Sequence, residues 1–233
     1  MKTLYKKEIN YYLNNPVGYI IVIVFAVFAN FLFVKDIFAV GVASMRSFFE
    51  IAPWLLMVFV PASSMRIFSE EKRINTLEVL LTLPVKEEQI VLAKFLSLIT
   101  MVVIALILTL SLPLSLIFLT KIYLPEVFVG YLGLVFFSMM MVSLSMIFSL
   151  MTKNQVVAFL SSAIVIFILL VLGGDFFAST LPRFIRDFLA YFSPSYHLLS
   201  FQKGLVDGRG LFYFLSATTI FLLINTFLLK NRD

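Results

Sequence analysis

The sequence is short of the residues that most catalytic and metal sites use. It contains no cysteine and one histidine, and only 13% of its 233 residues are charged. Without cysteine the chain forms no disulfide and carries no thiol nucleophile. The one histidine, His197, cannot supply the three or four ligands of a usual zinc site, so we interpret it as a packing and hydrogen-bonding residue.

A phosphate-binding loop is also missing. The pattern Gly-x-x-x-x-Gly-Lys-Ser/Thr does not occur, and the two glycine-rich places, at 173–174 and 204–210, lack its lysine and hydroxyl. The apolar runs contain neither paired carboxylates nor a serine beside a base, and their polar residues are too scattered for the ring that a channel needs. We therefore predict a chain that is not an enzyme and binds no cofactor or metal. Any ATP-driven step would need a separate polypeptide.

Apolar residues are abundant instead: they make up 61% of the chain, including 27 phenylalanines. About 20 apolar residues cross the hydrocarbon core, and backbone in lipid must satisfy its own hydrogen bonds, so apolar runs without alternation predict helices. The sequence predicts an all-α polytopic membrane protein with one domain, 1–233, and six spans, at about 17–34, 48–68, 95–119, 127–151, 156–172 and 211–229. Lys35-Asp36 should end the first span.

Several polar or small residues lie inside or beside these spans. Pro53, Pro61 and Pro113 allow kinks, and Glu50 is interpreted as a residue at the boundary of the second span. The serines of spans three and four are expected to let helices pack closely rather than to act as nucleophiles; they are Ser111, Ser115, Ser138, Ser143, Ser145 and Ser149.

The basic residues predict the orientation. With the amino terminus inside, 11 of the 18 Lys and Arg residues lie in cytoplasmic segments, and four of the other seven lie in one long outer loop, 173–210. Cytoplasmic loops of membrane proteins are enriched in Lys and Arg, so both termini are predicted to be cytoplasmic, in a multi-pass protein of the cell (inner) membrane. The formal charge of +5 is interpreted in the same way and not as nucleic-acid affinity.

Two segments outside the spans are amphipathic. Residues 1–15 alternate apolar and basic side chains and should form an interfacial helix that ends before Pro16. The outer loop is rich in aromatic residues, and a short helix is expected over 182–189, with Pro182 in its first turn, and a second after Ser193-Pro194. Apolar runs this short cannot span, so we interpret them as interfacial or re-entrant.

The densest cluster of charge lies between spans two and three, within Arg66–Pro84. A helical projection predicts one surface helix over 69–83, with Glu71, Asn75, Glu78 and Thr82 on its polar edge and Ile74, Leu77 and Leu81 on its apolar side. Pro84 should begin the next helix, with Glu87 and Glu88 near its positive end. The two interpretations of the cluster are a solvated loop and a docking element for a partner protein.

Two motifs resemble a known family. The first is Phe68-Ser-Glu-Glu-Lys-Arg73 with Thr76-Leu-Glu-Val-Leu-Leu-Thr-Leu-Pro-Val85; the second is Ser193-Pro-Ser-Tyr-His197 with the downstream residues Phe201, Gly204, Asp207 and Arg209. Together they resemble ABC-2 type transporter permeases, and most closely the small six-span subunits of gliding motility and nitrous-oxide-reductase maturation. Gly210 departs from the second motif, where a charged or apolar residue is expected.

The resemblance implies a permease subunit of an ATP-driven exporter, working with a cytoplasmic ABC ATPase dimer that holds ATP and Mg. It implies a second copy or a related permease subunit as partner, and it makes residues 69–83 the coupling helix. An alternative is a membrane subunit that relays ATPase motion to a periplasmic partner without transporting a solute. The residues implied are Glu70, Glu71, Lys72, Arg73, Asn75, Thr76, Glu78 and Thr82 for ATPase contact, Ile74, Leu77, Leu81 and Pro84 for packing, and Pro194, His197, Phe201, Gly204, Asp207 and Arg209 for the outer motif.

Overall fold

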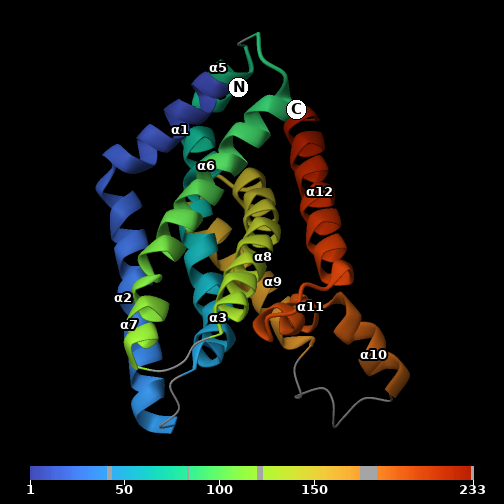
Figure 1. The fold of residues 1–233 in the computed structure, drawn as a ribbon. Helices are drawn as coiled ribbons and strands as arrows, with labels where there is room; N and C mark the ends of the chain where they lie inside the picture. The colour runs from blue at the N-terminus through green and yellow to red at the C-terminus, as the bar shows by residue number, and fades with distance from the viewer. Residues whose placement is uncertain (41–43, 83, 120–122, 174–182, 232–233) are drawn as a thin grey trace.

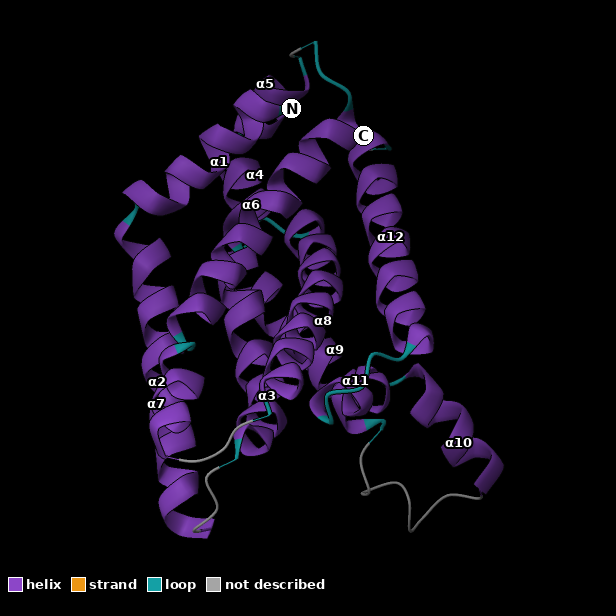
Figure 2. Ribbon diagram, in the orientation of Figure 1, coloured by secondary structure: helices purple, strands orange, loops and turns teal. Residues whose placement is uncertain are grey.

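The computed structural model describes residues 1–40, 44–82, 84–119, 123–173 and 183–231. These residues form helices joined by short loops and include no strand (Figure 2). In chain order the helices are α1 (Lys2–Asn14), α2 (Pro16–Val40), α3 (Met45–Ser64), α4 (Arg66–Arg73), α5 (Thr76–Leu81), α6 (Glu87–Leu108), α7 (Ser111–Leu119), α8 (Leu124–Met151), α9 (Gln155–Val171), α10 (Arg183–Phe192), α11 (Pro194–Gln202) and α12 (Gly208–Lys230). The predicted all-α fold class is confirmed.

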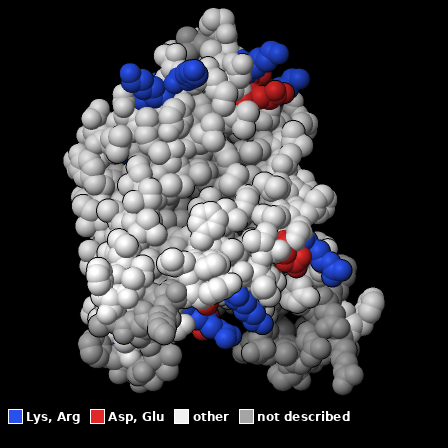
Figure 3. All heavy atoms as spheres, in the orientation of Figure 1, with Lys and Arg blue, Asp and Glu red and all other residues white. Residues whose placement is uncertain are grey.

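Helix α8 lies at the centre of the bundle and packs against α3, α6, α9, α11 and α12. Five helical stretches, those containing α2, α3, α6, α8 and α12, are long and apolar enough to cross a membrane, and α9 is a shorter apolar helix. Both marked termini lie at the same end as α5, and α10 and α11 lie at the opposite end (Figure 1). On the face shown in Figure 3 the coloured charges gather toward the two ends and leave an uncharged band between them.

The turn between α1 and α2 is set by Asn15 and Pro16. Asn15 is extended (φ −96°, ψ 127°), as expected of a residue before proline, and Pro16 begins α2. The Asn15 side chain then accepts a hydrogen bond from the Val17 amide at 3.1 Å and so caps α2. Helix α2 continues to Val40 through Lys35 and Asp36. The helix thus extends beyond the two charges that are predicted to end the span, whereas the apolar stretch that could cross a membrane ends at Ile37, directly after them.

Proline 53 lies inside α3 and leaves one carbonyl of that helix without its usual partner. The carbonyl four residues before a proline receives no helical N–H, which here is the carbonyl of Phe49. The side-chain amide of Gln202, on α11, donates to this Phe49 oxygen at 2.7 Å. A side chain of α11 therefore supplies the hydrogen bond that this carbonyl of α3 lacks, and the bond fixes α11 against α3.

The third predicted span is interrupted by the same effect. It is one span in the prediction but two helices in the structure, α6 and α7, separated at Thr109-Leu110. Pro113 lies four residues after Thr109, so the Thr109 carbonyl loses its usual α-helical donor and accepts from the Leu112 amide at 3.0 Å instead. The phenol of Tyr131 on α8 donates to that carbonyl at 3.1 Å. The kink that Pro113 allows is therefore placed by a contact with the central helix.

The end opposite the termini is built from α10, α11 and the start of α12 (Figure 1). Ser193 caps α11 by accepting from the Ser195 amide, and Asp207 caps α12 by accepting from the Arg209 amide. The predicted helix after Ser193-Pro194 is therefore present as α11, and α10 occupies most of the segment for which the first short helix is expected. Pro182, which is predicted to lie in the first turn of that helix, is outside the described residues.

Glycine allows α8 and α11 to approach closely. A Cβ atom on Gly133 would lie 2.5 Å from the Cβ and 2.8 Å from the Cγ of Phe201, a fully buried side chain of α11. These atoms lie next to the Phe201 backbone and cannot rotate away. Any larger residue at position 133 must push α11 away from α8.

We expect Gly133→Val to destabilise the bundle by about 1–3 kcal/mol, the usual cost of overpacking a filled core. The measurement is the apparent unfolding temperature of the purified protein in detergent. Gly208→Ala is the matched control, because a Cβ there meets nothing within 4 Å. Equal unfolding temperatures for Gly133→Val and the parent protein would contradict the close contact.

Candidate functional site

The charged segment that the sequence singles out is not one helix. It forms α4 and α5, separated at Ile74 and Asn75, and Asn75 has a left-handed backbone (φ 57°, ψ 23°). Asparagine tolerates this conformation better than most residues, but the conformation ends a right-handed helix. The prediction of one continuous helix over 69–83 is therefore wrong. Residues on the two sides of Asn75 do not share the single polar edge that a helical projection gives them.

Helix α4 is held against α8 by one serine. The Ser149 hydroxyl accepts from the amides of Phe68 and Ser69, at 3.1 and 3.2 Å, and donates to the Met65 carbonyl at 2.9 Å. The first amides of a helix have no partner within it, so Ser149 acts as a cap supplied by another helix. Phe68 and Ser149 are both fully buried. The start of α4 is thereby fixed to the centre of the bundle.

Lys94 of α6 lies at the middle of a buried charge cluster. Its Nζ atom lies 2.7 Å from Oε1 of Glu71 on α4 and 3.1 Å from Oε1 of Glu8 on α1, and it donates to the Ile67 carbonyl at 3.0 Å. Lys94 is 1% exposed, and the Phe68 ring lies 5.2 Å from the ammonium. All three donors of the ammonium are used. We call Lys94, Glu8 and Glu71 the buried ion cluster; it joins α1, α4 and α6.

The cluster is costly to assemble and costly to break. Desolvating a charge in a protein interior costs several kcal/mol, which is recovered only where the geometry is good. Two carboxylates share one ammonium, and Oε2 of Glu71 is buried without a hydrogen-bond partner among the described residues. The three side chains therefore depend on one another, and removing the lysine would leave two buried carboxylates unpaired.

Helix α1 holds the charged segment from a second side through its tyrosines. The Tyr12 phenol donates to the Ser63 carbonyl at 3.1 Å, and the Tyr11 phenol donates to Glu70 at 3.0 Å. Burial, reinforced by the nearby Glu8 carboxylate, raises the pKa of Tyr12 well above its ordinary value, so the phenol stays a donor at neutral pH. A third tyrosine, Tyr5, hydrogen-bonds Thr100 of α6 at 2.8 Å. The amino-terminal helix is thus attached to α3, α4 and α6.

The predicted site residues divide into exposed and buried groups. Glu71 points inward to Lys94. Ile74, which is predicted to pack on the bundle, is 56% exposed, because the left-handed Asn75 directly after it interrupts the helix. Leu77 is buried as expected, together with Leu80. The side chain of Leu81 lies outside those described. The exposed members of the predicted set are Arg73, Asn75, Thr76, Glu78, Thr82 and Pro84, with Glu70 and Lys72 partly exposed.

The outer motif is a packing unit. His197 is buried, stacks on Tyr213 with ring centroids 4.1 Å apart, and hydrogen-bonds the Tyr191 carbonyl through Nε2 at 2.9 Å. Gly210, the departure from the family pattern, lies where a Cβ would come within 2.9 Å of the Phe201 ring. Glycine is therefore required there by this packing. The other residues of the motif belong to the same unit. Pro194 and Phe201 are buried, and Gly204 has a left-handed backbone with φ +74°. Asp207 caps α12, and Arg209, two residues later, is exposed.

Sequence reasoning missed Glu8, Lys94 and Ser149 as members of this site. The sequence did hold a signal for Lys94: it is the eighth residue of its helix and has apolar residues on both sides, and a lysine that is buried in such a place must have a partner. Its partners could not be identified, because Glu8 is 86 residues away in the sequence. Within the described ranges, no group of three His, Asp or Glu residues is placed to hold a metal ion.

These features define the class of the protein: it is a multi-pass α-helical membrane protein with a charged, anchored segment between its second and third long apolar helices. The family model described as ABC-2 family transporter protein matches residues 2–233. The chain therefore belongs to the ABC-2 transporter family and is a permease component of an ABC transporter, a membrane component that pairs with an ABC ATPase. A comparison with curated proteins finds no match.

We expect Lys94→Met to lower the free energy of unfolding by about 3 kcal/mol, because it leaves two buried carboxylates without their cation. Thermal unfolding in detergent measures the effect. The triple variant Lys94→Met, Glu8→Gln and Glu71→Gln should regain part of the loss, since no buried charge remains. Lys153→Met is the control, because that lysine is exposed. A Lys94→Met protein as stable as the Lys153→Met protein would contradict the cluster.

Proposed function

We propose that α4 and α5 are the element through which an ABC ATPase moves this permease, and that the permease is an exporter. The observation that carries the proposal is the contrast between the two helices. Helix α4 is bound to α1, α6 and α8 by ion pairs and hydrogen bonds, whereas α5 presents an uncovered face at one end of the molecule. The export direction and the role of ATP and Mg on the ATPase dimer rest on family membership.

The exposed face mixes apolar and polar side chains. Ile74 is 56% and Val79 63% exposed, and the exposed Glu78 and Thr82 lie beside them in the chain. Helix α5 lies at the end where both termini are found (Figure 1). Apolar side chains rimmed by polar ones are typical of protein–protein contact sites. An ATPase surface that covers this face would give Ile74 and Val79 the burial that they lack.

A displacement of α5 would be transmitted to the bundle through the contacts of α5 and α4. Leu77 and Leu80 are buried, so a displacement of α5 acts on the core as well as on α4. From α4 the contacts lead to three helices: Glu71 to Lys94 on α6, the Phe68 amide to Ser149 on α8, and Glu70 to Tyr11 on α1. Closure of the ATPase dimer would in this way move several spans together. Pairing with a second copy, or with a related permease subunit, would complete the transport path.

We expect both termini and α4–α5 to be cytoplasmic, in the inner membrane, because basic residues are enriched at that end. The chain has no cysteine, so single-cysteine variants report topology without background. A membrane-impermeant maleimide should label Lys203→Cys in intact cells and Lys72→Cys only after the cytoplasmic side is opened. The parent chain, which should stay unlabelled, is the control. The reverse pattern would overturn the orientation.

We expect a photo-reactive maleimide on Ile74→Cys to crosslink, in native membranes, to a polypeptide that mass spectrometry identifies as an ABC ATPase. Ile74 suits this probe because more than half of its surface, 56%, is exposed. Tyr196→Cys on α11 is the matched control, since its side chain is similarly exposed, at 52%, but lies at the opposite end. ATPase crosslinks from Tyr196→Cys and not from Ile74→Cys would reject the proposed contact.

A further inference from the structure

An apolar groove runs along the membrane-facing side of α2 and α3. Its cavity volume is about 520 Å³. The lining is apolar throughout, and Ile20, Val24, Phe28 and Val58 leave about half of their side-chain surface uncovered. The residues that line it are Ile20, Ile21, Val24, Phe25, Phe28, Leu55, Val58, Phe59 and Ala62.

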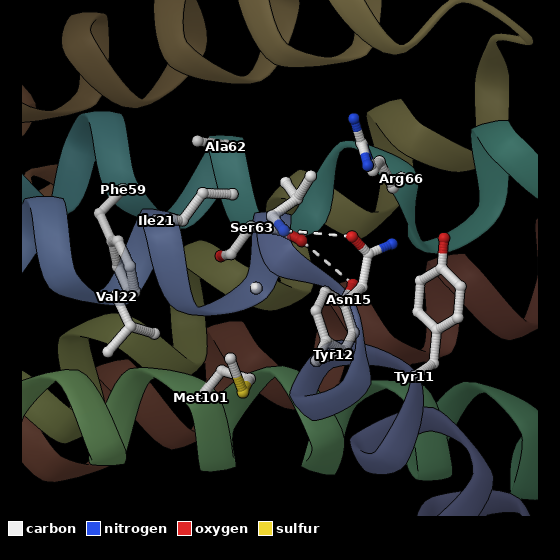
Figure 4. Close-up of a pocket in the computed structure, with 12 residues that line it drawn as sticks. Tyr11, Tyr12, Asn15, Ile21, Val22, Phe59, Ala62, Ser63, Arg66 and Met101 are labelled. Carbon is white, nitrogen blue, oxygen red and sulfur yellow. Dashed lines mark hydrogen bonds between the residues drawn. The ribbon is translucent and has the colours of Figure 1, made fainter.

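A second, much smaller cavity of about 20 Å³ adjoins this groove. Ile21, Phe59 and Ala62 line both cavities, so the two lie next to each other. Beyond them the second cavity is lined by Tyr11, Asn15 and Arg66, among others. Figure 4 shows this order: Arg66, Asn15 and Tyr11 gather at one end of the view, and Phe59 and Val22 lie at the other. The two neighbouring cavities therefore have polar side chains at one end and an apolar lining along the rest.

Arg66 is the cationic residue at the polar end, and Glu8, Glu70 and Glu71 line a further cavity beside it. Its Nε atom is buried and has no hydrogen-bond partner, and among the described residues Arg66 takes part in no ion pair. The neighbouring carboxylate, Glu70, accepts from Tyr11 and lies 3.9 Å from Arg73 instead. A buried guanidinium nitrogen without an acceptor is costly, and its planar donor array matches phosphate oxygens.

The position of the two ends fits a membrane lipid. Pro16 begins α2 and Ser64 ends α3, so the polar end lies where the chain enters and leaves the apolar band. From Val17 to Phe28 the lining covers about 16 Å at 1.5 Å per residue. Half of the hydrocarbon core is about 15 Å thick. The apolar lining is therefore about as long as one leaflet is deep, which would place the guanidinium at the level of the phosphates.

We propose that this groove is a binding site for a glycerophospholipid of the leaflet in which α1 lies. The lipid phosphate accepts hydrogen bonds from the Arg66 guanidinium, and one acyl chain lies between α2 and α3 along Ile21, Phe59 and Val24. A second copy of the chain could also cover an apolar face, but it would leave the guanidinium without an anion. The site is independent of the proposed function, since it uses neither α5 nor the ATPase contact.

The site lies where α1, α2, α3 and α4 meet. Tyr12 and Ser63, which hydrogen-bond each other, line the cavity together with Arg66. A bound lipid would thus contact the amino-terminal helix and the start of α4 at the same time. Occupancy should raise the unfolding temperature of the parent protein, because a ligand that binds only the folded state stabilises it.

The test uses the full-length protein, purified in detergent, stripped of lipid and titrated with phosphatidylglycerol while native mass spectrometry counts bound molecules. We expect one tightly bound lipid and at least about a tenfold weaker affinity for Arg66→Gln, the loss expected when a charge-assisted contact is removed. Arg73→Gln is the matched control: it removes the same charge from the same helix, outside the groove. Ala62→Phe, which fills the junction of the two cavities and leaves the charge in place, should also weaken binding.

The remaining measurements identify the ligand. Diacylglycerol with the same acyl chains should bind much more weakly, and inorganic phosphate at millimolar concentration should not displace the phospholipid. Equal binding by the Arg66→Gln and Arg73→Gln proteins, or displacement by phosphate, would overturn the proposal. Efficient disulfide formation between two copies of a Val24→Cys protein in membranes would also overturn it, by showing that a second copy covers the groove.

Discussion

The structure depends on one buried cation. Lys94 lies in an apolar helix, and its ammonium must be neutralised wherever the fold places it. Glu8 and Glu71 meet that requirement from opposite sides, which draws the amino-terminal helix and the charged segment onto α6. Both carboxylates depend on the one ammonium, because its loss would leave each of them in the interior without a cation. The segment that the partner ATPase is proposed to move is for this reason part of the bundle and not a loose loop.

The same physical rule, that a buried polar group needs a partner, explains the other long-range contacts. Proline removes an N–H from a helix, and the carbonyls of Phe49 and Thr109, which lose their usual α-helical donor, accept hydrogen bonds from the side chains of Gln202 and Tyr131. The free amides at the start of α4 donate to Ser149. In lipid no water is available to satisfy such groups, so at these three places a side chain from another helix supplies the hydrogen bond. The kinks and the tertiary contacts of this bundle are consequently linked to each other.

The sequence was sufficient for the long apolar helices, because length and apolarity alone determine which segments can cross a membrane; five of the six predicted spans contain such a helix, and the fifth span coincides with the shorter apolar helix α9. It was also sufficient for the packing role of His197, which lacked partners for any other chemistry. It was insufficient for the charged segment, since a helical projection assumes an unbroken helix and Asn75 interrupts it with one left-handed residue. Glu71 looked like a surface residue for the same reason. Identifying its partner required the position of Lys94, which depends on how α6 packs and not on any local pattern.

Helices α3 and α4 are almost continuous, since Met65 between them keeps a helical backbone (φ −55°, ψ −29°). The 29 residues of Met45–Arg73 thus form a lever that crosses the whole bundle, about 43 Å long at 1.5 Å per residue. If the lever turns as a rigid body about one end, a tilt of about 5° displaces the other end by about 4 Å. Gln202 of α11 is hydrogen-bonded to this lever at Phe49, near the end far from α4. A small rotation at α4 would therefore shift the position of α11.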